Sequence, residues 1–530
     1  MAIAVEDWQR AARLFAQARF ADARIAIEAM LAQDPDSAEA WLALTQVDIH
    51  SGEVRLAAQH ALSAAALRPV NPKTSVDIAA ALLTVGEVAA ARASLEQAAS
   101  LAPREAALRQ QLALQYQNLG DHDAALTWME RARESGLVDP ASRFTLANQF
   151  TFHGRLAAAE AELEQCALLR PPFGRAMAQL SQLRRQTPEH NHLDLLGRQL
   201  AEVQVGCVDH AALEFARYKE LEDLARYEEA WQSLQRANQL MHALVQHDAD
   251  AEQRTIAKLR AQTTRSVTAS SRQQSGPQPI FVVGLPRSGT TLLDRLLGNH
   301  VDVYPAGELG TFRRCLERVA NRFTGPMLDE AFVQRLASVD LAEVGALYLA
   351  NTQWRAQGRR FFVDKLPRNW LLVPMIHEAI PGAKILHMTR EPIAVAFSNY
   401  RSYFGSDYPY CYDEDALAKH YLGYRRTMHD WHALRPGAIL DVPYRSLVAE
   451  PGVALRRVFE FCGLDWQPDC VDLTRNQRPV ATLSAVQVRG AIETGMGGRW
   501  RHYESHLARL RQRIAVADQE IPVFHGAKGG

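Results

Sequence analysis

Four glycines in the first third of the chain recur at a constant interval of 34 residues: Gly52, Gly86, Gly120 and Gly154. An alanine follows each of them by five positions, at Ala57, Ala91, Ala125 and Ala159. Three prolines share the interval and a fourth lies two intervals further on, at Pro35, Pro69, Pro103 and Pro171. A fixed period of this length indicates a solenoid, because each short unit can bury its apolar face only against the next copy.

Each unit has the pattern of two antiparallel helices. The glycine suits a tight turn between them, the alanine allows the helices to approach closely, and the proline ends the second helix. One period earlier, Ala18 and Ala23 occupy the glycine and alanine positions. This pattern resembles the tetratricopeptide repeat, with about five repeats over residues 1–172.

The strict period ends near residue 172. Residues 173–262 keep a helical pattern, and Ala225 and Ala230 restore the five-residue spacing once, so we interpret this region as divergent repeats or a cap. Residues 263–279 are small, polar and punctuated by Gly and Pro, which predicts a linker. The remaining pattern predicts a second domain over residues 280–515.

Composition excludes several classes of protein. Lys and Arg number 59 and Asp and Glu 60, so the net charge of −1 indicates no general affinity for nucleic acid or for an anionic membrane. The six cysteines form no C-x-x-C pair, which favours free thiols in a reducing compartment over disulfides or a zinc site. The first residues lack a leader pattern, and no apolar run reaches the roughly 18 residues of a membrane span. We therefore expect a cytoplasmic protein.

The second domain opens with an apolar run that leads into Gly284 and then Gly289. This G-x-x-x-x-G spacing, with Thr291 in the Ser/Thr position, is that of a P-loop, whose backbone N–H groups and following helix bind phosphate oxygens. Thr290 occupies the lysine position, which argues against a nucleotide triphosphatase because that lysine contacts the β- and γ-phosphates. Arg287 provides positive charge within the loop instead.

The string Pro286-Arg-Ser-Gly-Thr-Thr291 resembles the 5′-phosphosulfate loop of sulfotransferases, in particular protein-tyrosine sulfotransferases and bacterial relatives with N-terminal tetratricopeptide repeats. The resemblance implies an α/β domain with a mainly parallel sheet, following the α-helical solenoid. It also implies that 3′-phosphoadenosine 5′-phosphosulfate (PAPS) donates a sulfuryl group to an acceptor hydroxyl. The loop residues that would contact the donor are Arg287, Ser288, Gly289, Thr290 and Thr291.

Two further segments match the same family. The resemblance assigns the 3′-phosphate to Arg390, which we expect at the carboxyl end of a strand, and to Ser398 on the helix that follows. An arginine suits this role because its fork can bind a phosphate through two hydrogen bonds. The segment around Lys365 resembles the one whose lysine approaches the oxygen between sulfate and phosphate, so Lys365 and Arg287 would stabilise charge on the leaving group.

The resemblance also reaches the end of the domain. It adds Tyr444, at the end of an expected strand, and Ser484 and Arg489, in a segment that would fold over the nucleotide. Arg489 departs from the lysine that the animal enzymes carry there. Trp500 resembles a family tryptophan and is equally compatible with packing.

A tyrosine acceptor requires a catalytic base. Its phenol has a pKa of ~10 and must lose its proton as its oxygen attacks the sulfuryl group. Glu308, in a Gly-Glu context shortly after the loop helix, matches the glutamate of protein-tyrosine sulfotransferases. His300 and His387 are alternatives, because the small-molecule branch of the family uses histidine. We expect no metal in this chemistry, since no acidic ligand cluster stands out.

The resemblance favours a tyrosine in a protein or peptide as acceptor, and a concave solenoid offers a surface to bind it. A small-molecule or glycan hydroxyl remains an alternative, and a homodimer is left open. Two other classes also stay open: a P-loop kinase or NTPase, and a repeat scaffold whose second domain has lost catalysis.

Overall fold

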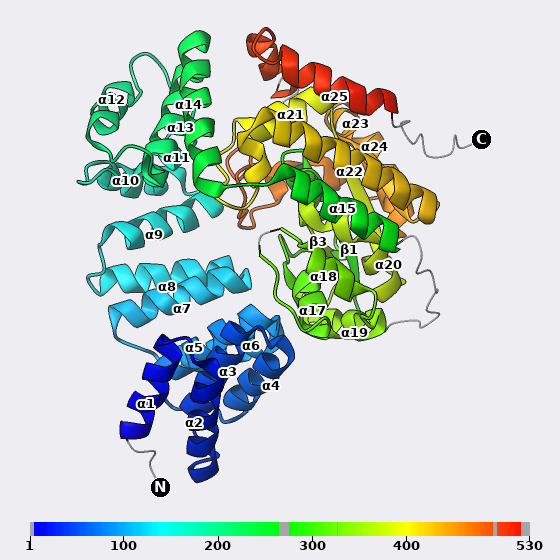
Figure 1. The fold of residues 1–530 in the computed structure, drawn as a ribbon. Helices are drawn as coiled ribbons and strands as arrows, with labels where there is room; N and C mark the ends of the chain where they lie inside the picture. Colours follow the sequence, from blue (N-terminus) through cyan, green and yellow to red (C-terminus); the bar gives the residue numbers. More distant parts are fainter. Residues whose placement is uncertain (1–4, 264–274, 326, 491–495, 521–530) are drawn as a thin grey trace.

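The computed structural model describes residues 5–263, 275–325, 327–490 and 496–520. Figure 1 shows a stack of helices from the N-terminus that runs alongside a C-terminal α/β domain. The helices of the first part are α1 (Val5–Ala16), α2 (Phe20–Gln33), α3 (Ala38–Ser51), α4 (Val54–Ala66), α5 (Pro72–Val85), α6 (Val88–Ser100), α7 (Ala106–Leu119), α8 (His122–Glu134), α9 (Pro140–Phe152) and α10 (Leu156–Ala167).

The turns between paired helices confirm the predicted role of glycine. Gly52, Gly86 and Gly120 end α3, α5 and α7 with φ angles of 80°, 85° and 85°, and Gly154 has a φ of 75°. These are left-handed values, which only glycine adopts without cost. Ala18 takes the same conformation, with a φ of 56°, as its place one period earlier requires.

The alanine and proline positions are also confirmed. The repeating alanines are fully buried where paired helices cross: Ala57, Ala91, Ala125 and Ala159. The prolines follow the ends of α2, α4, α6 and α10: Pro35, Pro69, Pro103 and Pro171. The first part of the chain is therefore the expected helical repeat solenoid.

The following region is helical as well. Its helices are α11 (Gly174–Leu180), α12 (Leu193–Glu202), α13 (Val208–Asp223), α14 (Tyr227–Val245) and α15 (Ala249–Thr263). The turn between α13 and α14 repeats the solenoid geometry, because Ala225 has a φ of 58° and Ala230 is fully buried. Most of the predicted linker, residues 264–274, lies outside the described residues.

The C-terminal domain contains a parallel sheet, as expected. Its strands are β1 (Gln278–Gly284), β2 (Val303–Pro305), β3 (Phe361–Asp364), β4 (Lys384–Thr389) and β5 (Ile439–Pro443). In the described part of the chain they form one five-stranded sheet in the order β2-β3-β1-β4-β5, with every pair parallel. The carboxyl ends of β1 and β4 are therefore adjacent, and in such sheets ligands bind at this edge.

Helices cover both faces of the sheet. They are α16 (Thr290–Leu297), α17 (Thr311–Val319), α18 (Glu330–Leu336), α19 (Leu341–Thr352), α20 (Val373–Ala379), α21 (Pro392–Tyr400), α22 (Glu414–Leu434), α23 (Tyr444–Ala449), α24 (Pro451–Cys462) and α25 (Ala508–Glu520). Short 3-10 helices are η1 (Gln353–Ala356), η2 (Pro367–Leu372), η3 (Pro409–Tyr412), η4 (Pro468–Val471), η5 (Leu473–Arg475) and η6 (Met496–Tyr503).

Alternation along β1 divides the core of this domain into two layers. Ile280 and Val282 pack with α16 and α24, whereas Phe281 and Val283 pack with residues of α17, α19 and α22. This period of two follows from the pleat of a strand that is buried on both faces.

The solenoid packs against the C-terminal domain through its inter-helix turns. The Glu53 and Glu87 side chains, which directly follow two of the turn glycines, contact Asn321 and Arg318 of that domain. In the next repeat, Arg355 Nη2 donates to the carbonyl oxygen of Leu119 at 2.6 Å. The repeat period therefore places three successive turns, at Gly52, Gly86 and Gly120, against the same domain. No helix among the described residues is long and apolar enough to cross a membrane.

Candidate active site

The P-loop between β1 and α16 has a tightly constrained backbone. Gly284 and Gly289 have φ angles of 146° and 109°. A Cβ atom on Gly284 would lie 2.7 Å from the carbonyl oxygen of Met388, and one on Gly289 would lie 2.5 Å from the Tyr444 ring. Both glycines are therefore required by conformation and by space, as the spacing predicted.

Arg287 adopts a left-handed backbone within this loop, with a φ of 65°. Such a conformation is unfavourable for a side chain with a Cβ, and where it occurs in a binding loop it aims the side chain in a fixed direction. The Arg287 guanidinium donates to Ser484 Oγ at 2.6 Å, to Gln487 Oε1 at 3.0 Å and to Ser398 Oγ at 3.4 Å.

Further arginines surround Arg287. Arg390 directly follows β4 and donates to the carbonyl oxygen of Arg287 at 2.8 Å, with its guanidinium 4.6 Å from the centre of the Tyr444 ring. Burial, and then the charges of Arg401, Arg390 and Arg499, lower the pKa of Arg287 to about 10. Four cations held this closely repel one another, and a multiply charged anion between them would relieve that repulsion.

Two polar groups in this cluster have no partner. The Ser288 hydroxyl and Arg390 Nε are buried without a hydrogen bond. Buried donors are normally paired, so unpaired ones beside a P-loop mark a place for an anion. A phosphosulfate group fits these donors, the loop amides and the N-terminus of α16.

Lys365 and Glu308 lie beside the loop as an ion pair. The side chain of Lys365 is 1% exposed and its Nζ lies 2.5 Å from Glu308 Oε1, whereas Glu308 is 38% exposed. The buried carboxyl of Asp294 interacts electrostatically with this pair. Burial raises the pKa of Asp294 to about 6, although the charges of Lys365 and Arg295 lower it. Burial also raises the pKa of Asp364, which accepts a hydrogen bond from Tyr348 at 2.9 Å, to about 8.

A cavity of about 1510 Å³ extends from the P-loop and Glu308 to the solenoid. On one side its wall contains the P-loop, Glu308, Arg390, Ser398 and Tyr444. On the other side it is lined by residues of the helical region, Phe144, Phe152, Arg175, Gln179 and Phe215. The side chains of both domains therefore form one continuous binding space.

Ser484 lines the cavity, whereas Arg489 lies outside its wall. Residues 481–488 line the cavity, with Thr482 Oγ1 3.4 Å from Thr291 Oγ1. Arg489 instead donates to the carbonyl oxygen of Phe152 and packs against Gly154, at the turn between α9 and α10. Arg489, which replaces the lysine of the animal enzymes, therefore contacts the solenoid.

The two histidines considered as bases lie away from this cavity. His300 is buried against Phe459, and its Nε2 lies 2.9 Å from the carbonyl oxygen of Asp465. His387 contacts Asp441 and Tyr424 on the sheet face covered by α22. Trp500 is 7% exposed and belongs to the core, which fits the packing interpretation.

Sequence reasoning missed two arginines of the site. Arg401, just after α21, forms an ion pair with Glu222 of α13 at 2.5 Å and lines the cavity, as does Arg499. Glu222 also accepts from the Tyr218 hydroxyl at 2.7 Å. The only local signal was the position of Arg401 three residues after Ser398, and its partner is far away in the sequence.

A model of the sulfotransferase family matches residues 279–468. The C-terminal half carries a sulfotransferase-family domain. The sulfotransferase domain of the Synechococcus olefin synthase aligns with 47% of this chain and 98% of its own, at 22% identity and a TM-score of 0.32. The helical repeats resemble those of tetratricopeptide-repeat proteins.

Relatives in sequence cover only part of the chain. An uncharacterised protein of Aquifex aeolicus is 32% identical over 310 residues, which are 56% of this chain and 40% of that protein. A Caenorhabditis briggsae protein described as "Putative protein-tyrosine sulfotransferase" is 25% identical over 238 residues, which are 42% of this chain and 80% of that protein. The chain thus spans less than half the length of the first of these relatives.

Proposed function

We propose that this protein is a PAPS-dependent sulfotransferase that transfers a sulfuryl group to a tyrosine of a protein or peptide. The observation that carries the proposal is the convergence of Arg287, Arg390, Arg401 and Arg499 around a P-loop that lacks its lysine. In this proposal the sulfotransferase domain comprises residues 280–515, and residues 1–172 and 173–262 form the repeats and their divergent extension.

The nucleotide would lie along the carboxyl edge of β1 and β4. The amides of residues 287–291 and the Ser288 hydroxyl would bind the 5′-phosphosulfate, and Arg390 with Ser398 would bind the 3′-phosphate. The ring of Tyr444 is held against the Arg390 guanidinium, so it would offer a flat surface to the nucleoside. PAPS supplies the sulfuryl group, and arginines and amides neutralise the phosphates without a requirement for metal.

Glu308 and Lys365 would divide the chemistry between them. The exposed carboxylate of Glu308 faces the cavity and would accept the proton of the attacking hydroxyl. Lys365 is almost fully buried and paired with Glu308, and its ammonium would stabilise charge on the leaving phosphate oxygen. Their ion pair keeps both groups in position before the substrates arrive.

Aromatic side chains support the choice of tyrosine as acceptor. Around the cavity these are Phe144, Phe152, Phe215, Tyr403, Phe404 and Tyr408, from both domains. Aromatic walls of this kind pack well against a phenol ring, and a cavity of about 1510 Å³ would accommodate neighbouring peptide residues.

Isothermal titration of PAPS tests the nucleotide site. Arg390→Ala is expected to raise the Kd about 10- to 100-fold, because it removes charge-assisted hydrogen bonds worth about 1.5–3 kcal/mol. Arg457→Ala, an exposed arginine of α24, serves as the matched control and should leave the Kd unchanged. Unchanged binding in a folded Arg390→Ala variant would contradict the site.

Transfer of labelled sulfate to a tyrosine-peptide library and to a panel of phenols and glycans tests the reaction. Glu308→Gln and Lys365→Ala are expected to lose most of the transfer while they retain PAPS binding. Transfer to small hydroxyl compounds alone would show that the acceptor is wrong and the chemistry right. Magnesium-dependent ATP turnover without any response to PAPS would overturn the proposal.

A further inference from the structure

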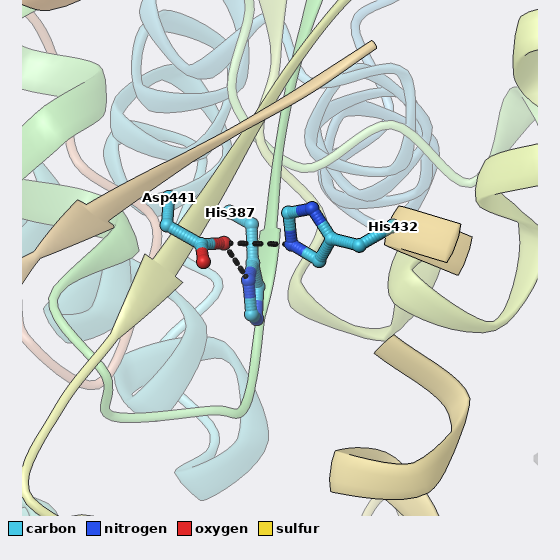
Figure 2. A group of neighbouring side chains, drawn as sticks. All are labelled: His387, His432 and Asp441. Atoms are coloured by element: carbon cyan, nitrogen blue, oxygen red, sulfur yellow. Dashed lines mark hydrogen bonds and ion pairs between the residues drawn. The ribbon is translucent and has the colours of Figure 1, made fainter. Parts of the chain in front are cut away.

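A second group of chemically active side chains lies behind Arg390, outside the proposed catalytic site. His387 of β4 and Asp441 of β5 are direct neighbours in the parallel register. Their side chains therefore emerge on the same face of the sheet. His432, near the end of α22, meets them from the helix that covers this face (Figure 2).

The three side chains converge on one point. Asp441 Oδ1 lies 2.7 Å from His387 Nδ1 and 3.0 Å from His432 Nε2. One ligand atom from each residue lies within 4.8 Å of the others. Around a tetrahedral ion with bonds of about 2.0–2.1 Å, ligand atoms lie roughly 3.4 Å apart. Small rotations of the side chains would therefore make room for an ion without any movement of the backbone.

The surroundings orient these groups as in metal sites. The other ring nitrogen of His387, Nε2, contacts the hydroxyl of Tyr424, which would fix the ring with Nδ1 toward Asp441. The side chains of His387 and His432 are 5% and 12% exposed.

An open side of the group faces a cavity. This second cavity, of about 420 Å³, is lined by all three residues, by Arg425 and Arg445, and by Ser288, Arg390 and Tyr444 at the back of the proposed nucleotide site. An ion held by two histidines and one carboxylate would keep a coordination position toward this space, and the arginines would favour an anion or hydroxide there. Two nitrogen ligands disfavour calcium and magnesium, which prefer oxygen, and favour zinc, iron(II), cobalt or nickel.

We propose that His387, His432 and Asp441 bind one divalent transition-metal ion, with zinc as the expected occupant. The ion would join β4, β5 and α22 directly behind the strand end that carries Arg390. This site is separate from the sulfuryl-transfer chemistry, in which we assign no role to a metal.

Equilibrium dialysis of the chelator-treated full-length protein against Zn²⁺, with metal quantified by mass spectrometry, tests the proposal. We expect about one equivalent bound by the unmodified chain, and at least a tenfold loss of affinity in His432→Ala and in Asp441→Asn. The second variant keeps the shape of the side chain and one acceptor oxygen but removes the negative charge. Cobalt should give a visible absorption band in the unmodified protein that both variants lack.

The solenoid provides the matched control. His60 Nδ1 lies 2.6 Å from Asp48 Oδ2, which is a histidine–aspartate pair without a second histidine. His60→Ala should leave zinc binding unchanged. The proposal is overturned if the unmodified protein binds neither metal, or if folded His432→Ala and Asp441→Asn, checked by circular dichroism, bind it as tightly as the unmodified chain.

Discussion

At the scale of single residues, two left-handed turn positions allow the free-energy cost of the backbone conformation to be measured without a change in packing. Ala225 and Gly52 occupy equivalent turns, with φ angles of 58° and 80°. Ala225 is exposed, and a Cβ added to Gly52 would meet nothing within 4 Å. Substitutions at these two positions therefore change backbone strain and chain entropy with little effect on contacts.

Ala225→Gly is expected to stabilise the fold by about 0.5–1 kcal/mol. A left-handed L-residue costs roughly 1–2 kcal/mol, and the greater freedom of glycine in the unfolded chain offsets roughly 0.4–1 kcal/mol of this gain. Gly52→Ala should produce the opposite change of similar size. Urea unfolding of both variants measures the difference, and destabilisation by Ala225→Gly would contradict the conformational explanation.

Asp364 gives the stability a pH dependence. Burial raises its pKa to about 8, above the ordinary value of 3.8, so the folded state retains a proton that the unfolded chain loses. The contribution of the protonated Asp364 carboxyl to the free energy of unfolding is complete below about pH 4 and is lost as the pH rises to about 8. The free energy of unfolding then falls by up to about 1.4 kcal/mol per pH unit. Asp364→Asn, which still accepts from Tyr348, should flatten this decline.

Denaturant unfolding at a series of pH values between 4 and 8 measures the effect. The exposed Asp36→Asn variant serves as the control and should follow the unmodified protein. If Asp364→Asn shows the same slope as the unmodified chain, another group is responsible for it.

At the scale of elements, the segment of residues 480–489 connects the P-loop with the solenoid. Ser484 and Gln487 accept from Arg287, and at the other side Val480 N donates to the carbonyl oxygen of Phe152 at 2.8 Å. Arg489 donates to the same carbonyl oxygen. The solenoid thereby holds the strip of chain that covers the proposed nucleotide site.

Arg489→Ala is expected to weaken PAPS binding about 3- to 10-fold, although Arg489 lies outside the cavity wall. The loss reflects the removal of about one net hydrogen bond, worth roughly 0.5–1.5 kcal/mol, from the anchor of this segment. Arg489→Lys, which restores the lysine expected of the family, should recover less than half of the loss because a lysine lacks the fork that packs on Gly154. Titration of PAPS measures both, and unchanged affinity in Arg489→Ala would contradict the anchoring role.

At the scale of the whole molecule, the solenoid and the α/β domain share one interface and one cavity. The turn residues Glu53 and Glu87 and the carbonyl oxygen of Leu119 each contact a residue of the C-terminal domain. Arg92 of α6 adds a cation–π contact with Trp354, at 4.5 Å. Contacts repeated along successive turns couple the two parts more strongly than any one of them does.

Combined Glu87→Ala and Arg355→Ala substitutions are expected to separate the thermal unfolding of the two domains. Both side chains are buried, and their removal takes out polar contacts at two successive turns. Differential scanning calorimetry should show one transition in the unmodified protein and two in the double variant. Lys73→Ala, which removes an exposed ion pair with Asp77, is the control and should keep one transition.

Local patterns were enough to predict much of this architecture. The 34-residue interval predicts the turns, the buried alanines and the ends of the helices. Each of these features depends only on residues within one helix pair. The P-loop, the strand that ends before Arg390 and the helix that carries Ser398 are predicted in the same way. The resemblance to sulfotransferases added the order of these motifs along the chain.

The remaining features depend on contacts between distant segments. Arg401 acquires its position from Glu222, which lies 179 residues earlier, and Arg489 contacts the carbonyl oxygen of Phe152, which lies 337 residues earlier. The histidines at 387 and 432 meet Asp441 only because β4, β5 and α22 pack together. Periodicity and loop spacing are properties of a short stretch of backbone, so the sequence alone determines the repeats and the P-loop. The direction of a long charged side chain depends on which partner the folded chain brings within hydrogen-bonding distance, and that is decided only in the tertiary structure.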